Sequence, residues 1–237
     1  MYYEIRGEGR PVVLLHGGLA TIRLSFEKQI RVLARNHRVV AIEQIGHGHT
    51  ADVAGREFTY EGMAEDTAAL LTQLGIRNAD VIGWSDGGQL ALRLALTHPE
   101  LVRRVIVSGV GLDATMPEDV ERRKHANEAL SSDLWPEASD EYAQVSPDGA
   151  QHWPIFFAKV RAMWANPSRG ISERELADIK APTLIIAGDK ENVERHMHIF
   201  RGITGAKLCI LPGTGHATFP DRANWLNPII LEFLDQN

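Results

Sequence analysis

The sequence predicts one α/β domain in which a mainly parallel sheet carries helices on both of its faces. Short apolar segments of strand length alternate along the chain with longer segments of helical periodicity, an order that favours parallel strands joined by helical crossovers. Three of the apolar segments run straight into glycine-rich turns, at residues 16–18, 83–87 and 213–216. The length of 237 residues is within the range of a single domain with a large core.

Seven segments have the length and composition of strands: Tyr2–Ile5, Val12–His16, Val39–Ile42, Ala79–Ile82, Arg104–Ser108, Thr183–Ala187 and Lys207–Leu211. Helical patterns lie between them at Phe26–Ala34, Tyr60–Leu74, Gly87–His98, Glu194–Ile203 and Ala223–Asp235. The helix at Tyr60 has Thr59 as its expected N-cap and Gly75 as its expected stop.

The most informative motif is Gly83-Trp84-Ser85-Asp86-Gly87, which stands between a strand and a helix. Gly-x-Ser-x-Gly in that setting is the signature of a nucleophile elbow, in which a sharp turn exposes the serine hydroxyl. A Cβ on either flanking glycine would clash where the strand reverses into the helix. The backbone N–H of Asp86 and the positive end of the helix dipole then face a developing oxyanion.

Two further strand-to-loop junctions complete the pattern of an acyl-transfer site. The first ends in His16-Gly17-Gly18, a glycine turn whose unpaired N–H groups suit an oxyanion hole, so Gly18 is its second expected donor. His16 is interpreted as a structural histidine packed beside this turn. The second junction ends in Gly213-Thr214-Gly215-His216, and histidine is the usual general base for a serine.

With these motifs the chain resembles the α/β-hydrolase family over nearly its whole length. The matching landmarks are the His-Gly-Gly turn at 16–18, Gln44-Ile45-Gly46-His47-Gly48, the elbow at 83–87, the strand and turn at 182–189, and Gly213-Thr214-Gly215-His216. The elbow is most similar to that of valacyclovir-hydrolase-like and other small carboxylesterase-type members. The resemblance also implies that an extra antiparallel strand, usual in the family before the one at Tyr2–Ile5, is missing here, which would leave the sheet edge bare.

One segment interrupts the alternation and divides the chain into a core (1–111 and 171–237) and a helical lid (112–170). The resemblance implies a lid at this place. The segment contains an acidic turn led by Pro117, a middle rich in helix breakers, and a helix from about Ala150 to Ala165 that stops at Asn166-Pro167. That last helix carries an aromatic and apolar stripe: Trp153, Phe156, Phe157, Val160 and Trp164. The stripe is expected both to pack on the core and to roof a modest apolar pocket, so Trp153 and Phe157, with Trp84, are candidate substrate contacts.

The third member of the triad, which orients His216, has three candidates. The family's acid usually lies three residues after the glycine that ends the strand, which points from Gly188 to Glu191. Asp189 directly follows the glycine and is the alternative acid, although it also suits a turn residue that caps its own backbone. Asp113 is the third candidate, because some family members take their acid from that region.

Composition excludes several classes of function. A net charge of −6 without a basic block argues against nucleic acid or an anionic membrane surface as a partner. The chain has no apolar run of spanning length and no signal-peptide pattern at its start, so a cytoplasmic enzyme is expected. Ten histidines show no metal-ligand spacing, so no metal is expected, and the single Cys209 reads as a buried apolar residue. The oligomeric state is open.

The predicted function is a serine hydrolase that cleaves a small carboxylic ester through an acyl-enzyme, without a cofactor. Ser85 is the nucleophile, His216 the general base and Glu191 the orienting acid, with the N–H groups of Gly18 and Asp86 in the oxyanion hole. A carbon–carbon bond hydrolase, a cofactor-free perhydrolase and a ligand-binding member with vestigial hydrolysis are the alternatives.

Asp86 supports a narrower substrate prediction. Its carboxylate lies one residue from the nucleophile, and resemblance to the valacyclovir-hydrolase-like members implies that it pairs with a protonated amine of an amino-acid ester. The simpler interpretation is that Asp86 only complements the helix dipole.

Overall fold

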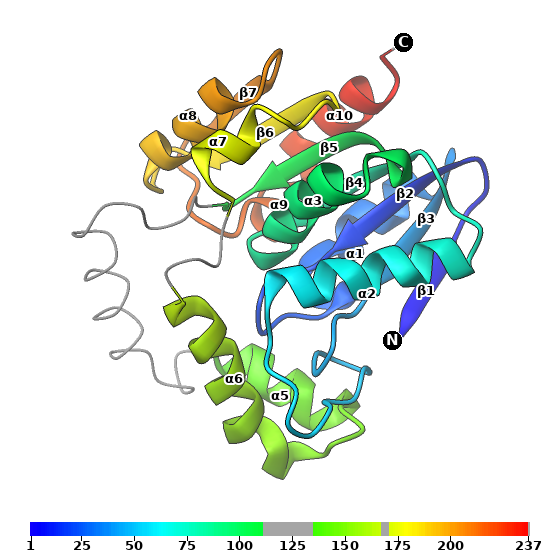
Figure 1. Cartoon of the computed structure of the whole chain (residues 1–237), viewed down its shortest axis with the longest axis vertical. Helices are drawn as coiled ribbons and strands as arrows, with labels where there is room; N and C mark the ends of the chain where they lie inside the picture. The colour runs from blue at the N-terminus through cyan, green and yellow to red at the C-terminus, as the bar shows by residue number, and fades with distance from the viewer. Residues whose placement is uncertain (111–134, 167–170, 237) are drawn as a thin grey trace.

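The computed structural model describes residues 1–110, 135–166 and 171–236. Its strands are β1 (Tyr3–Arg6), β2 (Arg10–Leu15), β3 (His37–Ile42), β4 (Ala79–Trp84), β5 (Val102–Ser108), β6 (Thr183–Gly188) and β7 (Lys207–Leu211). They form one sheet in the order β1-β3-β2-β4-β5-β6-β7 (Figure 1). Only the β1–β3 pair is antiparallel, and every other neighbouring pair is parallel. The predicted mainly parallel sheet is therefore confirmed.

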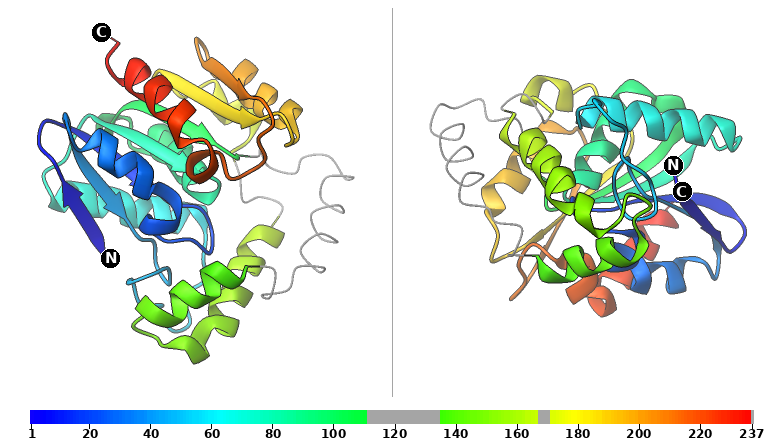
Figure 2. Two further views of the ribbon diagram at one scale, coloured as in Figure 1. Left: turned by 180° about the vertical axis from the view of Figure 1, so that it is seen from behind. Right: turned by 90° about the horizontal axis from the view of Figure 1, so that it is seen from below.

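Helices cover both faces of this sheet (Figure 2). The helices of the core are α1 (Ile22–Leu33), α2 (Tyr60–Gln73), α3 (Asp86–Thr97), η1 (Pro99–Leu101), α7 (Glu173–Leu176), α8 (Val193–Gly202), α9 (Thr218–Asp221) and α10 (Ala223–Leu234). α1, α9 and α10 lie on one face, and α2 and α3 lie on the other. Among the described helices, none combines the length and the apolar character needed to span a membrane.

The alternation of side chains along β2 explains the two layers. Val12 and Leu14 belong to the apolar cluster under α1 and α10, whereas Val13 and Leu15 belong to the cluster under α2 and α3. All four are fully buried. A strand buried on both faces reads as a continuous apolar run, and burying each such side chain contributes about 1.5–3 kcal/mol.

Threonine caps set two of the helix starts. The Thr59 hydroxyl accepts from the Gly62 N–H, which confirms the expected cap of α2. Thr21 caps α1 in the same way, so this helix begins at Ile22 and not at Phe26 as the apolar periodicity indicated. The cap satisfies an otherwise unpaired N–H of the first turn, and the periodicity alone does not reveal it.

The sheet has β1 at one edge. β1 pairs with β3 on one side only, and Tyr3 and Ile5 are more than a third exposed. At the other edge, Cys209 on β7 is half-buried and not fully buried as predicted. Burial nevertheless raises the pKa of the Cys209 thiol, in keeping with an unreactive side chain.

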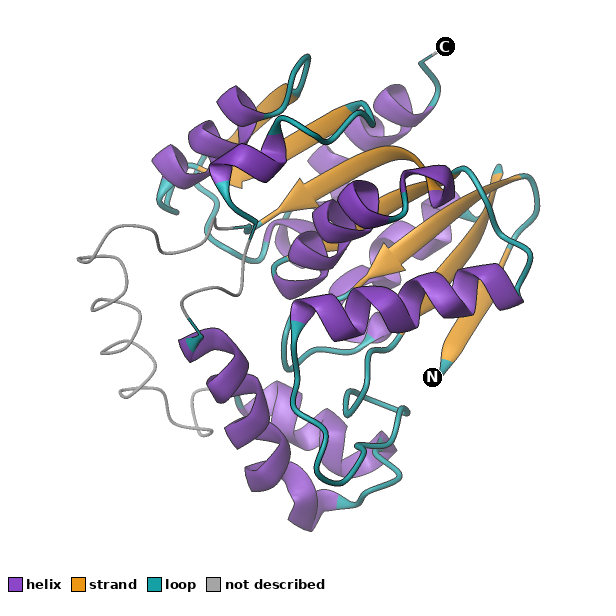
Figure 3. Cartoon of the chain, in the orientation of Figure 1, coloured by secondary structure: helices purple, strands orange, loops and turns teal. Residues whose placement is uncertain are grey.

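A separate pair of helices lies beyond the carboxyl ends of the strands (Figure 3). This α5–α6 segment, residues 135–166, consists of α5 (Pro136–Val145), η3 (Ala150–His152) and α6 (Trp153–Ala165). Pro136, which the sequence analysis placed in a breaker-rich stretch, occupies the first position of α5, where a proline loses no hydrogen bond. The predicted Pro117 turn lies outside the described residues.

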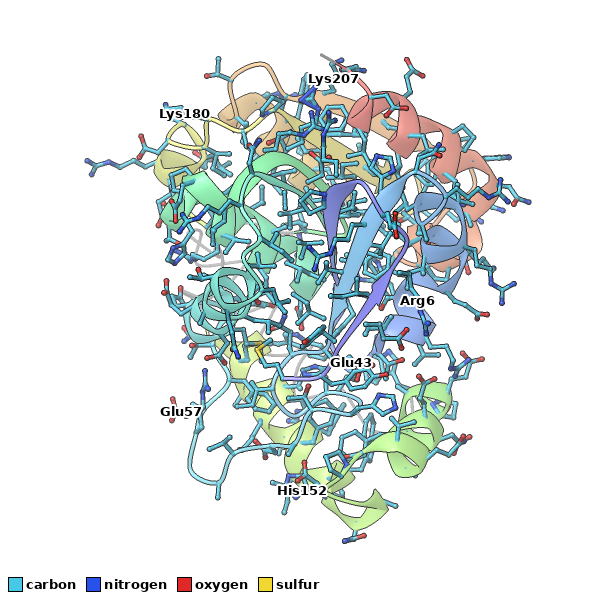
Figure 4. All side chains as sticks on the ribbon, turned by 90° about the vertical axis from the view of Figure 1, so that its right-hand side faces the viewer. Arg6, Glu43, Glu57, His152, Lys180 and Lys207 are labelled. Atoms are coloured by element: carbon cyan, nitrogen blue, oxygen red, sulfur yellow. The ribbon has the colours of Figure 1, made fainter. Side chains whose placement is uncertain are left out.

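Ion pairs and a hydrogen bond fasten the α5–α6 segment to the core. Asp52 accepts from Lys159 Nζ at 2.7 Å and from His152 Nε2 at 2.9 Å. Glu141 of α5 accepts from the hydroxyl of Thr21 and from the guanidinium of Arg23. Figure 4 places His152 at the far end of the segment, with Glu43 between the segment and the sheet. The segment is thus held at both of its helices.

Candidate active site

A sharp turn after β4 places Ser85 between the sheet and α3. Ser85 has a φ of 54°, a left-handed conformation that is costly in a non-glycine residue and clusters at functional turns. A Cβ on Gly83 would lie 2.1 Å from the carbonyl oxygen of Gly87, and one on Gly87 would lie 1.9 Å from that of Leu15. Both glycines are therefore required by space, as expected for a nucleophile elbow.

His216, on the loop after β7, lies between Ser85 and Glu191. Its Nε2 is 3.0 Å from Ser85 Oγ, and its Nδ1 is 2.7 Å from Oε1 of Glu191. The His216 side chain is 51% exposed, whereas that of Glu191 is 13% exposed. The imidazole is thus open to a substrate on one side and held by a shielded carboxylate on the other.

The electrostatics of Glu191 suit an ionised carboxylate. Burial acts to raise the pKa of Glu191, but the hydrogen bond from His216 and the positive charge that His216 and His196 can carry outweigh it. The pKa of Glu191 therefore lies below its ordinary value. The second oxygen, Oε2, accepts from the Gly188 N–H at 3.3 Å, which fixes the carboxylate against the end of β6.

Gly109, directly after β5, leaves room for the imidazole. A Cβ on Gly109 would lie 2.5 Å from Cε1 of His216 and 3.0 Å from its Nδ1. The φ of Gly109 is +68°, which also favours glycine. A glycine at the end of β5 therefore leaves the space that the His216 imidazole occupies.

Asp189, the alternative acid, points elsewhere. Its Oδ1 accepts from the Thr214 N–H at 3.1 Å, and backbone hydrogen bonds from Gly213 and Thr214 hold the pKa of its carboxyl below the usual value. Asp189 thus braces the loop that carries His216, and none of its hydrogen bonds is to the imidazole. Asp113, the third candidate, lies outside the described residues.

The turn after β2 packs directly against the elbow. A Cβ on Gly17 would lie 3.3 Å from Cβ of Ser85, so the two turns touch. Within the described part of the chain, neither the Gly18 N–H nor the Asp86 N–H donates to a loop acceptor. Unengaged donors beside the nucleophile are what an oxyanion hole needs.

His16 is structural, as predicted. Its Nδ1 donates to the Gly17 carbonyl at 2.8 Å and its Nε2 accepts from the Gln44 N–H at 3.0 Å, so both ring nitrogens are occupied. His47 packs on it with ring centroids 4.9 Å apart. Burial lowers the pKa of both histidines to about 4, and both are therefore neutral at neutral pH.

The Asp86 side chain is not free, contrary to the assumption behind the amine prediction. Tyr60 Oη donates to its Oδ1 at 2.5 Å, and the indole Nε1 of Trp164 donates to its Oδ2 at 2.8 Å. Asp86 is only 8% exposed. Its carboxylate therefore links α3 to α2 and to the α5–α6 segment.

A cavity of about 670 Å³ opens over Ser85. The described residues that line it come from the turn after β2, the elbow, the α5–α6 segment and the loop around His216: Gly17, Gly18, Leu19, Ala20, Leu24, Trp84, Ser85, Trp135, Pro136, Glu137, Ala138, Trp164, His216, Ala217, Pro220 and Asp221. Its size is typical of small-molecule sites. None of these lining residues is a lysine or an arginine.

One of the four predicted substrate contacts lines the cavity, and the other three do not. Trp84 is part of the lining, whereas Asp86, Trp153 and Phe157 are not. Trp153 and Phe157 are buried in the apolar core instead. The aromatic residues that line the cavity from the α5–α6 segment are Trp135 and Trp164, of which the predicted stripe contained only Trp164.

Comparison with known families agrees with this geometry. Residues 12–228 match the model of the alpha/beta hydrolase family. The chain belongs to the alpha/beta hydrolase family. The fold therefore follows from both the sheet order and the match.

The names of individual relatives describe different kinds of hydrolase. A 2-hydroxymuconate semialdehyde hydrolase from Pseudomonas sp. (strain CF600) is 26% identical, with 96% of this chain and 88% of the relative covered. Serine hydrolase BPHL from Mus musculus is 25% identical, with 99% and 82% covered. An alpha/beta hydrolase enzyme from a Medee basin deep-sea metagenome library shares the fold with a TM-score of 0.80 at 21% identity, covering 100% of this chain and 94% of that one.

Proposed function

We propose that this hydrolase is a serine esterase that cleaves a small carboxylic ester through an acyl-enzyme. The observation that carries the proposal is the hydrogen-bonded series from Ser85 Oγ to His216 Nε2 and from His216 Nδ1 to Glu191, at 3.0 and 2.7 Å. A nucleophile, a base in reach of it, and a carboxylate that orients the base are the parts that acyl transfer needs.

In the first half-reaction, Ser85 Oγ bonds to the ester carbonyl carbon while its proton passes to His216 Nε2. The oxyanion accepts hydrogen bonds from the N–H groups of Gly18 and Asp86. Collapse of this intermediate breaks the bond to the alcohol oxygen, which takes the proton from His216. Glu191 stabilises the imidazolium throughout and keeps its own proton count unchanged.

In the second half-reaction, water repeats the sequence of proton transfers. His216 takes a proton from the water, whose oxygen attacks the acyl carbon, and then returns that proton to Ser85 Oγ. The exposed edge of His216 supports this step, because the imidazole lines the cavity and is accessible to solvent there. The products are a carboxylic acid and an alcohol, and the balance requires only water.

The lining favours a small substrate that carries no negative charge. Three tryptophans and aliphatic residues supply most of the wall, Glu137 and Asp221 are carboxylic acids in the lining, and none of the described lining residues is a lysine or an arginine. Cleavage of an amino-acid ester stays an untested prediction. The Asp86 carboxylate, which was expected to bind the substrate amine, already accepts hydrogen bonds from Tyr60 and Trp164.

A carbon–carbon bond hydrolase is the second candidate. It is supported by the 2-hydroxymuconate semialdehyde hydrolase, which is 26% identical along 96% of this chain. The same serine, base and acid would serve that reaction. The two candidates differ in the bond broken, so product analysis separates them.

The test is a matched panel of p-nitrophenyl esters from acetate to decanoate, together with a vinylogous 1,5-diketone as the carbon–carbon substrate. We expect turnover of the short esters to exceed that of the diketone, and Ser85→Ala to abolish it. Turnover of the diketone alone would replace the esterase proposal with the second candidate. Turnover of neither by a folded protein would contradict both.

A further inference from the structure

The carboxylate of Asp86 joins three elements that are distant in sequence. It belongs to the first residue of α3, and it receives Tyr60 Oη from α2 at 2.5 Å and Trp164 Nε1 from α6 at 2.8 Å. Each oxygen has one donor. Both donors are neutral, and no described basic side chain forms an ion pair with Asp86.

The same contact meets the turn after β2. A Cβ on Gly18 would lie 2.2 Å from Oδ2 of Asp86 and 2.7 Å from Cζ2 of Trp164. The indole therefore packs against the glycine whose N–H is the proposed oxyanion donor. Trp164 also lines the cavity, whereas Asp86 lies behind it and is 8% exposed.

We propose that Asp86 is a positioning residue, whose hydrogen bond from Trp164 Nε1 fixes the indole as one side of the acyl pocket. We call this hydrogen bond between Asp86 and Trp164 the clasp. Hydrogen bonds to an ionised acceptor are about twice as strong as neutral ones, and little water reaches this one. The clasp holds the end of α6 near the nucleophile elbow and limits the room beside Gly18. Asp86 thus influences which acyl groups fit by fixing the position of Trp164, and it does not bind the acyl group itself.

This role differs from recognition of a substrate amine. An amine would have to reach a carboxylate that stands behind Trp164 and already accepts two hydrogen bonds. If the clasp is correct, a change of Asp86 should lower the activity of the enzyme toward an α-amino ester and toward its des-amino analogue by the same factor. Pairing with an amine predicts a loss confined to the amino ester.

The first arm of the test uses no substrate. The chain has five tryptophans, so ¹⁵N-indole NMR of the whole protein gives a small set of signals, and Trp164→Phe identifies that of Trp164. We expect Asp86→Asn to move this signal upfield and to speed its hydrogen exchange by about tenfold. The half-exposed Trp225 is the internal control and should not move.

The second arm rests on the proposed function and measures kinetics across the acyl series. Asp86→Asn and Trp164→Phe should each raise KM for the acetate ester about 3- to 10-fold, with a smaller change in kcat, and shift the preference to longer acyl chains. The double variant should equal the single variants within about twofold, because both remove one contact. Trp225→Phe is the matched control for loss of an indole.

Several results would overturn the clasp: an unmoved Trp164 signal in Asp86→Asn, additive effects in the double variant, or a loss confined to the amino ester. If the wild type cleaves no ester, the proposed function fails while the indole signal still reports on the clasp. Melting curves of each variant exclude unfolding as the cause of any change.

Discussion

The two carboxylates on either side of Ser85 have opposite surroundings. On the His216 side, Glu191 faces an imidazole that can take up a proton, and that imidazole is 51% exposed. On the Gly18 side, Asp86 is 8% exposed, and the donors to its carboxylate among the described residues are the neutral groups of Tyr60 and Trp164.

The difference indicates a division of labour around one nucleophile. A carboxylate beside a titratable, open imidazole can stabilise a charge that appears during the reaction. A carboxylate enclosed by neutral donors can only hold geometry. The proton-handling parts are therefore expected on the β6 and β7 loops, and the shape-defining parts between α3 and the α5–α6 segment.

The largest effect that tests this division is the loss of the acid. Glu191→Gln keeps the shape but removes the charge that stabilises protonated His216, and it should lower kcat about 10²- to 10⁴-fold with little change in KM. Asp189→Asn, a matched removal of a neighbouring charge, should cost less than about tenfold because it only loosens the Thr214 turn. Steady-state kinetics that gave the reverse order would make Asp189 the acid.

The buried histidines behind the Gly18 side predict a pH-dependent stability. His16 and His47 have pKa values of about 4 in the folded protein, against about 6.5 when unfolded. The unfolded chain therefore binds more protons between these values, so the free energy of unfolding should fall as the pH drops from 6.5 toward 4. A pKa shift of this size corresponds to a loss on the order of 3 kcal/mol of unfolding free energy for one histidine, and the two losses do not add fully because the charge of His47 also lowers the pKa of His16.

Urea unfolding at several pH values between 6.5 and 4.5 measures this slope. His47→Gln should flatten it, whereas His98→Gln, a change at the partly exposed histidine that caps the carboxyl end of α3, should not. Equal slopes in wild type and His47→Gln would contradict the burial argument.

Gly109 offers a smaller but more local test. Gly109→Ala would place a Cβ 2.5 Å from Cε1 of His216, so we expect a drop in kcat of about 10- to 100-fold. Gly75→Ala is the matched control, because Gly75 has nearly the same φ (+67° against +68°) and no atom near its added Cβ. Both variants should lose similar stability, and an equal loss of kcat in both would remove Gly109 from the site.

The smallest expected effect concerns substrate charge. Because Glu137 and Asp221 line the cavity and none of the described lining residues is a lysine or an arginine, 4-carboxyphenyl acetate should react a few-fold more slowly than phenyl acetate at low salt. Asp221→Asn should narrow the gap. Glu8→Gln, a change of the same charge near the amino end of β2, should leave it unchanged.

The sequence predicted the parts of the site that local sterics fix. The sharp turn from β4 into α3 leaves no room for a side chain at Gly83 or Gly87, so the elbow can be recognised from a five-residue motif. The count from Gly188, which rested on the family resemblance, ranked Glu191 before Asp189, and of these two described residues the structure brings Glu191 to His216. The mainly parallel sheet followed from the alternation of apolar and amphipathic segments, whereas the order of its strands was not predicted.

The residues that close the cavity could not be predicted in the same way. Helical spacing shows that Trp153, Phe157 and Trp164 share a face of α6, but not where along that face the core ends and the cavity begins. The partnership of Asp86 with Tyr60 and Trp164 joins positions 26 and 78 residues apart. Such contacts depend on how α6 is set against the elbow, which no local pattern encodes.

The central claim, that Ser85 is an activated nucleophile, is tested most directly by a fluorophosphonate followed by peptide mass spectrometry. The account predicts one label per chain, on Ser85, which Ser85→Ala abolishes and His216→Ala slows by about 10²-fold or more. Labelling at another residue, or none on a folded protein that retains the Ser85–His216–Glu191 geometry, would contradict it.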